Sequence, residues 1–440
     1  MRASARTRSG GVWFRDYREL SRDRAIENAP IPPVCVIAMR QSAAPEADCV
    51  VEVGDVLAEG VLVGKADAAG SAAVHTPVPG RVAAIPEIRL AGGATSRAVV
   101  VELEGRFARS GKPITAWDWR AMSPGRIEER IRTSGVIGLS GESFPLRHLW
   151  RRGGGRRPES LVVNGVEPDA FLTATHRLLV ERAAELVVGV RIAEKLLQPS
   201  RVVIGVEAGR PEAADAVRSA LAAAGVRYEL VEIDARYPRG QARYLLESVT
   251  GRALPSPGEP EDIGCVVAGA DTLIAVYEAV VLGRPLTERV VTVSGVVKRP
   301  SNLKARLGTR IRDLVEECGG FREPPGTIVL GGPMMGSELK DLDAPLTKDI
   351  AGIVALSRRE SRAPRSTACV SCGECVRVCP AGLSPVTLHK QIDHGRYEEA
   401  AGDGLRECTE CGCCSFVCPA GIRLVESLRL GKARLEATGS

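Results

Sequence analysis

Apolar runs alternate with amphipathic segments between residues 123 and about 286. Short runs rich in Val, typical of buried strands, occupy residues 160–167, 201–207 and 228–233. Apolar side chains at helical spacing mark residues 125–136, 177–197 and 212–225. Strands that alternate with helices predict an α/β domain with a mostly parallel sheet. Ligands of such sheets bind beside the carboxyl ends of the strands, so the loops there are the first candidates for a site.

A β-rich pattern fills residues 31–102, where short apolar runs are broken by Gly and Pro. It resembles the flattened sandwich of biotinyl and lipoyl carriers. Such carriers present a lysine at a hairpin tip, but the tip expected at residues 67–74 has none, and Lys65 comes before it. We therefore expect a structural β-module.

A second β-rich pattern follows the α/β pattern. Residues 283–336 predict two strands, a helix and a third strand that ends in a Gly-rich turn. The connector at residues 357–367 carries four arginines. It predicts a solvated linker, with contact to an acidic partner as the alternative.

The cysteines are concentrated near the C-terminal end. Nine of the 13 lie between Cys369 and Cys418, in two runs of the form C-x₂-C-x₂-C-x₃-C-P. In the bacterial form of this run, the fourth cysteine ligates the other cluster. We therefore expect two [4Fe–4S] clusters, with these ligands: Cys369, Cys372, Cys375 and Cys418 for the first, and Cys408, Cys411, Cys414 and Cys379 for the second.

Two alternatives accompany this assignment. The same cysteines would also suit a pair of structural Cys₄ zinc sites, although two complete copies with both prolines favour iron–sulfur clusters. Cys413 is surplus to the pattern, and we expect it to pack in a core rather than ligate. The odd cysteine count in a long chain indicates a reducing compartment rather than a disulfide scaffold.

Composition and charge exclude several classes of protein. The chain of 440 residues is 44% hydrophobic and 26% charged, which is ordinary for a globular protein of several domains. Its 59 Lys and Arg against 54 Asp and Glu give a net charge of +5, too small to indicate nucleic acid as a partner. The basic N-terminus lacks the apolar stretch of a signal peptide, and no run is long enough for a transmembrane helix.

Two Gly-rich loops are candidates for nucleotide binding. Residues 135–145 read "GVIGLSGESFP" and residues 164–171 read "NGVEPDAF". Glycines let a backbone approach a phosphate, whereas the carboxylate of Glu142 would repel it. An ordinary turn is the alternative for each loop.

The order of these parts resembles one family. The two cysteine runs, "VVNGVE…LT…HRLL", "YEAVVLGRPLTERVVTVSG" and "GGPMMG" stand where the C subunit of the Rnf electron transport complex has them. The resemblance extends from about Ile31 to Leu435. The middle region is also similar to the flavin subunit of respiratory complex I and to the cobalamin reductase of propanediol utilisation.

The resemblance implies a multidomain fold of the α/β plus β class. The expected parts are an N-terminal tail (1–30), a barrel-sandwich-like β-module (31–105), an α/β domain for FMN and NAD(H) (123–283), a β-grasp domain for a soluble ligand (284–345), a basic linker (357–367) and an α-helical two-cluster ferredoxin-like domain (368–435).

The resemblance also implies a function. The chain is expected to sit peripherally on the cytoplasmic face of the inner membrane, in a complex with other subunits. There it would pass electrons between NAD(H), through FMN, and the two clusters, with ferredoxin or a ferredoxin-like subunit as partner. It would thus be a component of an NADH:ferredoxin-type oxidoreductase and translocase. The residues carried over for the cofactor are Gly138, Gly141, Phe144, Asn164, Gly165 and Glu167, and no catalytic residue is assigned.

The two loops depart from the family pattern. Where the family has a sequence close to "GLGGAGFP", Ser140 and Glu142 replace small residues, and Gly138, Gly141, Phe144 and Pro145 match. Where it has "NGAECEPYLT", Asn164, Gly165 and Glu167 match, and these do not: Pro168, Asp169, Ala170 and Phe171. Two other functions follow as alternatives: a cluster-bearing electron-transfer or scaffold subunit with a degenerate flavin site, and a cobalamin reductase.

Overall fold

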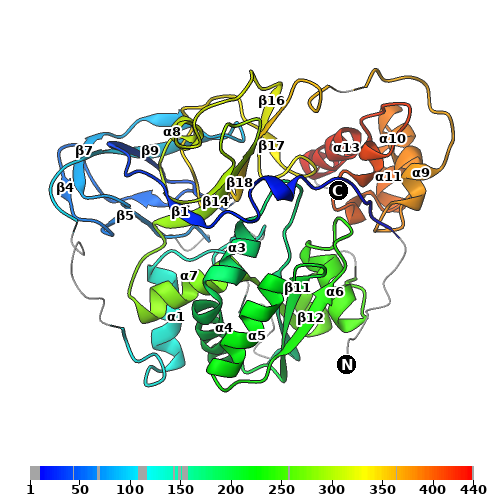
Figure 1. Ribbon diagram of the computed structural model, residues 1–440. Helices are drawn as coiled ribbons and strands as arrows, with labels where there is room; N and C mark the ends of the chain where they lie inside the picture. The colour runs from blue at the N-terminus through cyan, green and yellow to red at the C-terminus, as the bar shows by residue number, and fades with distance from the viewer. Residues whose placement is uncertain are drawn as a thin grey trace.

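The computed structural model shows four folded parts, three of which are connected by a strap from the N-terminal end (Figure 1). It describes residues 10–42, 44–66, 70–107, 116–141, 144–146, 150, 157–255, 258–362 and 364–438. In Figure 1 the β-module and the six-stranded sheet form the upper part, the α/β domain lies below them, and the cysteine-rich helices lie to one side.

The α/β domain is built on a parallel sheet of order β12-β11-β10-β13. Its strands are β10 (Ser160–Gly165), β11 (Arg201–Glu207), β12 (Glu229–Ile233) and β13 (Cys265–Gly269). Its helices are α1 (Pro124–Thr133), α3 (Ala174–Glu181), α4 (Ala183–Leu197), α5 (Pro211–Ala223), α6 (Ala242–Thr250) and α7 (Ala270–Val281), with a 3₁₀ turn η2 (Pro260–Ile263). All of β10 is buried because both of its faces are covered.

Alternate residues of β10 enter two different cores. Leu161 and Val163 pack with side chains of α3, α4, α5 and α7, while Val162 packs with Leu245 and Leu246 of α6. The sheet, marked by β11 and β12, lies below the two β-rich parts (Figure 1), and the segment after β10 leads into α3.

The β-module contains two small antiparallel sheets around one apolar core. The larger sheet has β2 (Val34–Ala38), β4 (Val56–Leu57), β7 (Gly80–Ala84), β8 (Glu87–Arg89) and β9 (Thr95–Leu103). The smaller has β3 (Asp48–Cys49), β5 (Leu62–Lys65) and β6 (Val74–His75). Residues 67–69, the first part of the hairpin tip expected at residues 67–74, lie outside the described residues.

The second β-rich part is a mixed sheet of order β1-β15-β14-β18-β16-β17. It consists of β1 (Ile26–Asn28), β14 (Glu288–Gly295), β15 (Ser301–Arg306), β16 (Thr327–Leu330), β17 (Ser337–Glu338) and β18 (Gly352–Leu356), with the helix α8 (Ile311–Glu317) packed on it. Two strands come from outside residues 284–345: β18 from beyond them, and β1 from the N-terminal segment.

The N-terminal segment, residues 10–28, crosses the molecule as a strap. Gly11 donates its N–H to the Val378 carbonyl at 2.8 Å in the cysteine-rich part, and Val12 pairs with Tyr237 of the α/β domain. After the 3₁₀ turn η1 (Arg18–Leu20), β1 pairs in parallel with β15. The strap therefore connects three parts of the fold, and it runs across the front of Figure 1.

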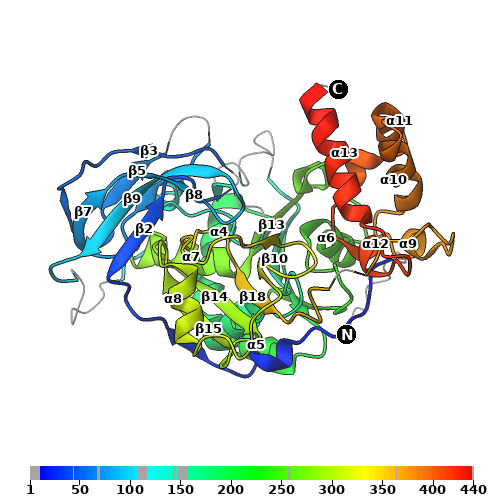
Figure 2. The same ribbon diagram turned by 90° about the horizontal axis from the view of Figure 1, so that it is seen from above.

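The cysteine-rich part is helical. It has α9 (Glu374–Arg377), α10 (Pro385–Asp393), α11 (Tyr397–Gly402), η3 (Leu405–Glu407), α12 (Cys413–Phe416) and α13 (Leu424–Thr438). Seen from above, these helices stand beside α6, with α12 on the side nearer to it (Figure 2). Among the described residues, no helix has the length and apolar character needed to span a bilayer.

Candidate functional site

A cavity of about 490 Å³ lies where the α/β domain, the β-module and the six-stranded sheet meet. The α/β domain contributes the ends of β10 and β13, the β-module contributes Arg40 and the turn before β9, and the sheet contributes Arg289 and the turn after β16. This position, beside the carboxyl ends of parallel strands, is the one expected for a ligand site. The volume is within the range that holds a cofactor-sized ligand.

The structure brings some of the residues predicted from sequence to this cavity. Gly141, Asn164 and Glu167 line it, whereas Gly138, Phe144 and Gly165 are not among the described residues that do. Gly165 instead packs inside the sheet, where a Cβ would lie 2.7 Å from the Gly205 carbonyl oxygen. Glu142, Ser143 and Arg147 lie outside the described residues.

Asn164 shapes the loop that leaves β10. Its side-chain amide donates to the Gly240 carbonyl at 2.8 Å, and its Oδ1 accepts the Val166 N–H at 3.1 Å. Asn164 is 3% exposed, so both bonds are shielded from water. This residue therefore fixes the course of the loop as well as lining the cavity.

Ser140 stands where the family has glycine, and the structure accommodates its side chain. The Ser140 hydroxyl donates to Asp271 Oδ1 at 2.7 Å, and the preceding Leu139 N–H donates to Thr272 Oγ1 at 2.8 Å. A Cβ on Gly269 would lie 1.8 Å from the Ser140 oxygen. The first residues of α7 thus hold the glycine-rich loop in place.

Two carboxyl groups after β10 are buried, and burial raises the pKa of each. The pKa of Glu167 rises to about 7. Two contacts partly oppose this rise: the positive charge of Arg18 nearby, and the His176 N–H, which donates to Glu167 Oε1 at 2.8 Å. The pKa of Asp169 rises to about 6, opposed by the N–H groups of Ala170, Met335 and Met334. Desolvation thus dominates at both positions.

Positive charge enters the cavity from the other two walls. Arg40 comes from the β-module and Arg289 from β14, and both line the cavity. An Arg289 nitrogen lies 3.7 Å from Asp271 Oδ2, and its Nη1 donates to the Lys348 carbonyl. Guanidinium groups are suited to bind phosphate. The cavity wall therefore carries both positive and negative groups, and its arginines suit the phosphate of a cofactor such as FMN.

Sequence reasoning missed several residues of this cavity. Arg40 and Leu90 come from the β-module, which was expected to be structural only, and Asp169 was noted as a departure from the family pattern. The quoted motif "GGPMMG", residues 331–336, was a family marker and also forms one wall. Its three glycines were the available signal that a backbone passes close to something there.

The cysteine-rich part repeats one local geometry. Ser371 and Glu410 have positive φ of 54° and 56°, and their N–H groups donate to Cys369 Sγ and Cys408 Sγ, each at 3.4 Å. Gly373 and Gly412, with φ of 74° and 77°, then begin α9 and α12. Amide donors to sulfur are typical of iron–sulfur sites, where they tune the cluster.

Each of the two runs supplies four cysteines in the repeated spacing, and each iron of a [4Fe–4S] cluster takes one thiolate. In the described part of the chain, no three His, Cys, Asp or Glu side chains are grouped as ligands of one metal ion. Cys413 is fully buried and packs with Val12, Tyr237 and Val378.

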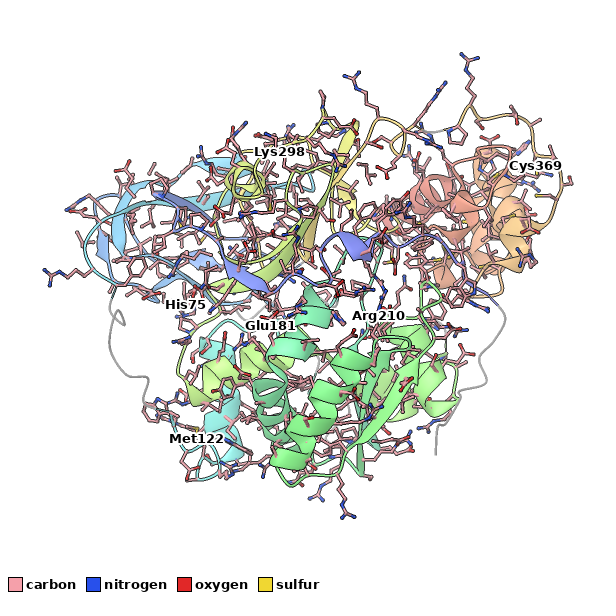
Figure 3. The ribbon with its side chains drawn as sticks, viewed as in Figure 1. His75, Met122, Glu181, Arg210, Lys298 and Cys369 are labelled. Atoms are coloured by element: carbon pink, nitrogen blue, oxygen red, sulfur yellow. The ribbon has the colours of Figure 1, made fainter. Side chains whose placement is uncertain are left out.

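The two cysteine runs differ in their surroundings. Cys411 and Cys414 are buried, whereas Cys369 and Cys372 are exposed. Tyr237 and Tyr244 of the α/β domain contact the second run: their hydroxyls bond to the Cys411 carbonyl at 2.7 Å and to Thr409 Oγ1 at 3.1 Å. Figure 3 shows Cys369 at the outer edge of this part. The second run therefore faces the body of the protein and the first faces outward.

Four family models match successive parts of the chain. They are the RnfC barrel sandwich hybrid domain at residues 6–106, the Nuo51 FMN-binding domain at 131–278, the SLBB domain at 290–338 and the 4Fe-4S dicluster domain at 365–422.

Curated relatives match nearly the whole length. The C subunit of the proton-translocating ferredoxin:NAD(+) oxidoreductase complex of Clostridium ljungdahlii is 34% identical over 89% of this chain and 85% of its own. The chain belongs to the RnfC family, the C subunits of Rnf ion-translocating oxidoreductase complexes. The C subunit of the Rhodobacter capsulatus ion-translocating oxidoreductase complex is 33% identical over 97% of this chain and 82% of its own.

Membership of the RnfC family confirms the predicted family and fold class. The matched models support two iron–sulfur clusters and FMN as cofactors. A crystal structure of an NAD+-reducing [NiFe]-hydrogenase shares the fold, with a TM-score of 0.53 and 18% identity over 74% of this chain and 65% of that one.

Proposed function

We propose that this chain is a peripheral electron-transfer subunit of a Rnf-type membrane complex, on the cytoplasmic face of the membrane. It passes electrons between NAD(H) and ferredoxin, or a ferredoxin-like subunit, through FMN and two [4Fe–4S] clusters. The family membership and the matched FMN and dicluster models support this function. One observation carries it: the cavity and the second cysteine run share a wall.

That wall is the turn at residues 331–336. Met335 and Gly336 line the cavity, while Met334 packs in the apolar cluster that contains Cys411 and Cys413. A Cβ on Gly412 would lie only 2.9 Å from the Met334 carbonyl oxygen. A cofactor in the cavity is therefore separated from the second run by one turn of backbone.

The residues that line the cavity have different roles in binding the cofactor. Gly141 and the loop after β10 accept the cofactor at the end of the sheet, and Arg40 and Arg289 supply positive charge for its phosphate. FMN, when bound, supplies the conversion between the two-electron chemistry of a hydride and the one-electron chemistry of a cluster. The three walls of the cavity come from three parts of the chain, so a bound cofactor would contact all three.

The surroundings of the two runs suggest an order for the clusters. The cluster on Cys408, Cys411, Cys414 and Cys379 lies next to the cavity. The cluster on Cys369, Cys372, Cys375 and Cys418 lies farther out, where Cys369 and Cys372 are exposed. We assign the outer cluster to the exchange of electrons with the partner.

The test is anaerobic purification followed by cofactor analysis. We expect about eight iron atoms and one FMN per chain, and NADH-dependent reduction of a one-electron dye. Iron without flavin and without NADH oxidation would contradict the proposal and favour the scaffold function. The peripheral position predicts release from membranes by high salt, which screens surface charge contacts; a chain extracted only by detergent would contradict that position.

A further inference from the structure

The turn at residues 331–336 is held on its cavity side by one buried carboxylate. Asp169 Oδ2 accepts the N–H of Met334 at 3.1 Å and that of Met335 at 3.0 Å, and Oδ1 accepts the Ala170 N–H at 2.7 Å. Asp169 is 3% exposed. Because amide bonds to a buried charge are among the stronger ones, these bonds fix the turn relative to the loop after β10.

The turn packs closely against the side chain of Asp169 at Gly332. A Cβ on Gly332 would lie 2.1 Å from both Cβ and Cγ of Asp169, so only glycine fits there. At the other end, Gly336 donates its N–H to the Gly332 carbonyl at 2.8 Å and closes the turn. A shift of Asp169 therefore moves the whole turn.

The strap holds the same loop from behind. Arg18 donates to the Asp169 carbonyl oxygen at 3.0 Å, and Tyr17 stacks on Phe171 with ring centroids 4.5 Å apart. Farther along the strap, Phe14 contacts the rings of Tyr237 and Phe416. The loop, the turn and the second cysteine run thus form one continuous packed unit.

We propose that Asp169 is a positioning residue that fixes the spacing between the cofactor cavity and the second cluster, by holding the Met334 backbone against Gly412. The effect of Asp169 on electron transfer rests on the proposed function. Its effect on the position of the turn, the mechanical part of the inference, rests on the contacts alone. Electron transfer between two centres slows steeply as their separation grows. A looser turn would therefore slow the transfer of electrons from the cofactor to the second cluster.

The mechanical part is tested on the full chain by amide hydrogen exchange. Asp169→Asn keeps the size of the side chain but replaces one acceptor oxygen with a donor group, which cannot accept an N–H. We expect exchange in residues 332–336 to rise roughly tenfold or more, with a smaller rise at 411–414.

The matched control is Asp349→Asn. Asp349 lines the same cavity, and its carboxylate accepts the Thr347 hydroxyl at 2.5 Å, so its effect should be confined to its own surroundings. Unchanged exchange at 332–336 in Asp169→Asn, or an equal rise in the control, would overturn the inference. Amide exchange can be measured without NADH or flavin. Failure of this inference can therefore be distinguished from failure of the proposed function.

The second arm disturbs the contact from the cluster side. Gly412→Ala places a methyl group against the Met334 carbonyl, whereas Gly373→Ala imposes the same left-handed strain on the first run with nothing within 4 Å. The difference between the two variants isolates the contact with Met334 from backbone strain.

Rapid-mixing absorbance separates reduction of the flavin by NADH from bleaching of the clusters. We expect Asp169→Asn and Gly412→Ala to slow cluster bleaching at least several-fold relative to the rate of flavin reduction in the same sample, with both rates compared at equal FMN and iron content. Slower flavin reduction with an unchanged cluster step would assign Asp169 to substrate binding instead and would overturn its positioning role.

Discussion

Tyr237 donates its hydroxyl to the backbone carbonyl of Cys411 at 2.7 Å. The tyrosine is 7% exposed, so the bond is buried at the contact between the α/β domain and the second cysteine run. The first run has Cys369 and Cys372 at the surface. The two halves of a repeated motif thus have different surroundings in the same chain.

This asymmetry predicts different results for two cysteine variants. Cys372→Ala and Cys411→Ala should each remove one cluster, leaving about four of the eight iron atoms. Because Cys411 also lies in the buried contact with Tyr237, its variant should in addition increase amide exchange in residues 234–241. Iron analysis and exchange of the purified chains measure both effects.

Cys413→Ser is the control for this pair, because Cys413 packs in the same buried cluster without belonging to the repeated pattern. Its iron content should equal that of the wild type. A half-loaded Cys413→Ser chain would contradict the ligand assignment, and stoichiometric zinc without visible absorbance would contradict iron–sulfur clusters altogether.

The strap predicts a large stability difference between two arginines. Arg18 is buried and pairs with Glu207 at 2.5 Å, whereas Arg15 pairs with Glu19 at the surface. Arg18→Met leaves the buried Glu207 with Arg210 as its remaining partner, at 3.3 Å, and removes two hydrogen bonds from a charged donor, so it should lower the free energy of unfolding by about 2 kcal/mol. Arg15→Met should change it little, because exposed pairs contribute little.

Thermal unfolding of the two variants in the same buffer is the measurement. Equal destabilisation would show that the strap contributes nothing through its buried charge. A large loss only in Arg18→Met, with faster exchange at residues 164–171, is the expected result, because Arg18 also holds the Asp169 carbonyl.

Local patterns predicted the elements well, because each pattern is set by neighbours in sequence. The period of apolar side chains predicted one helix over 177–197, whereas the structure divides it into α3 and α4 at Arg182. Leu161, Val162 and Val163 are all buried, in a strand that is covered on both faces. The spacing of the cysteines is likewise a local pattern, and by itself it predicts iron–sulfur ligands.

Contacts between residues far apart in the sequence could not be predicted, because local patterns depend only on neighbours in sequence. Nothing near Asp169 in sequence indicates that its carboxylate holds Met334 and Met335, and nothing near Arg40 indicates that the β-module closes a cavity. The N-terminal residues were expected as a tail because their polar, irregular sequence has no period. Their order comes from β15, Tyr237 and Val378, which lie far along the chain.

Lys348 predicts a pH dependence with a definite sign. Its ammonium group is buried between three parts of the fold and donates to the Ala73 carbonyl at 2.7 Å and the Gly135 carbonyl at 2.8 Å. Burial lowers the pKa of Lys348 to about 7. Between pH 7 and about 10 the unfolded chain therefore binds more protons than the folded one, and this lysine makes the fold more stable as pH rises.

The measurement compares wild type with Lys348→Met at several pH values. The free energy of unfolding of the wild type should rise relative to the variant by up to about 1.4 kcal/mol per pH unit in this window. The variant also leaves two buried carbonyls without a donor, which lowers its stability at every pH. A difference that stays constant from pH 7 to 10 would contradict a lowered pKa.

The last prediction concerns two of the substitutions in the glycine-rich loop, Ser140 and Glu142. An unpaired Glu142 near a phosphate would cost about 1–4 kcal/mol at effective dielectrics between those of water and of a protein surface, which is roughly a tenfold to thousandfold loss of affinity. Ser140 differs, because its hydroxyl is already bonded to Asp271 at 2.7 Å and carries no charge. We therefore expect Glu142→Ala to tighten FMN binding, and Ser140→Gly alone to change it little. Fluorescence titration of the two single variants and of the double variant with FMN measures this, and the double variant should resemble Glu142→Ala. If the wild type already binds FMN tightly and the double variant binds no tighter, the carboxylate of Glu142 points away from the phosphate or is paired with a cation, and the electrostatic hypothesis is wrong.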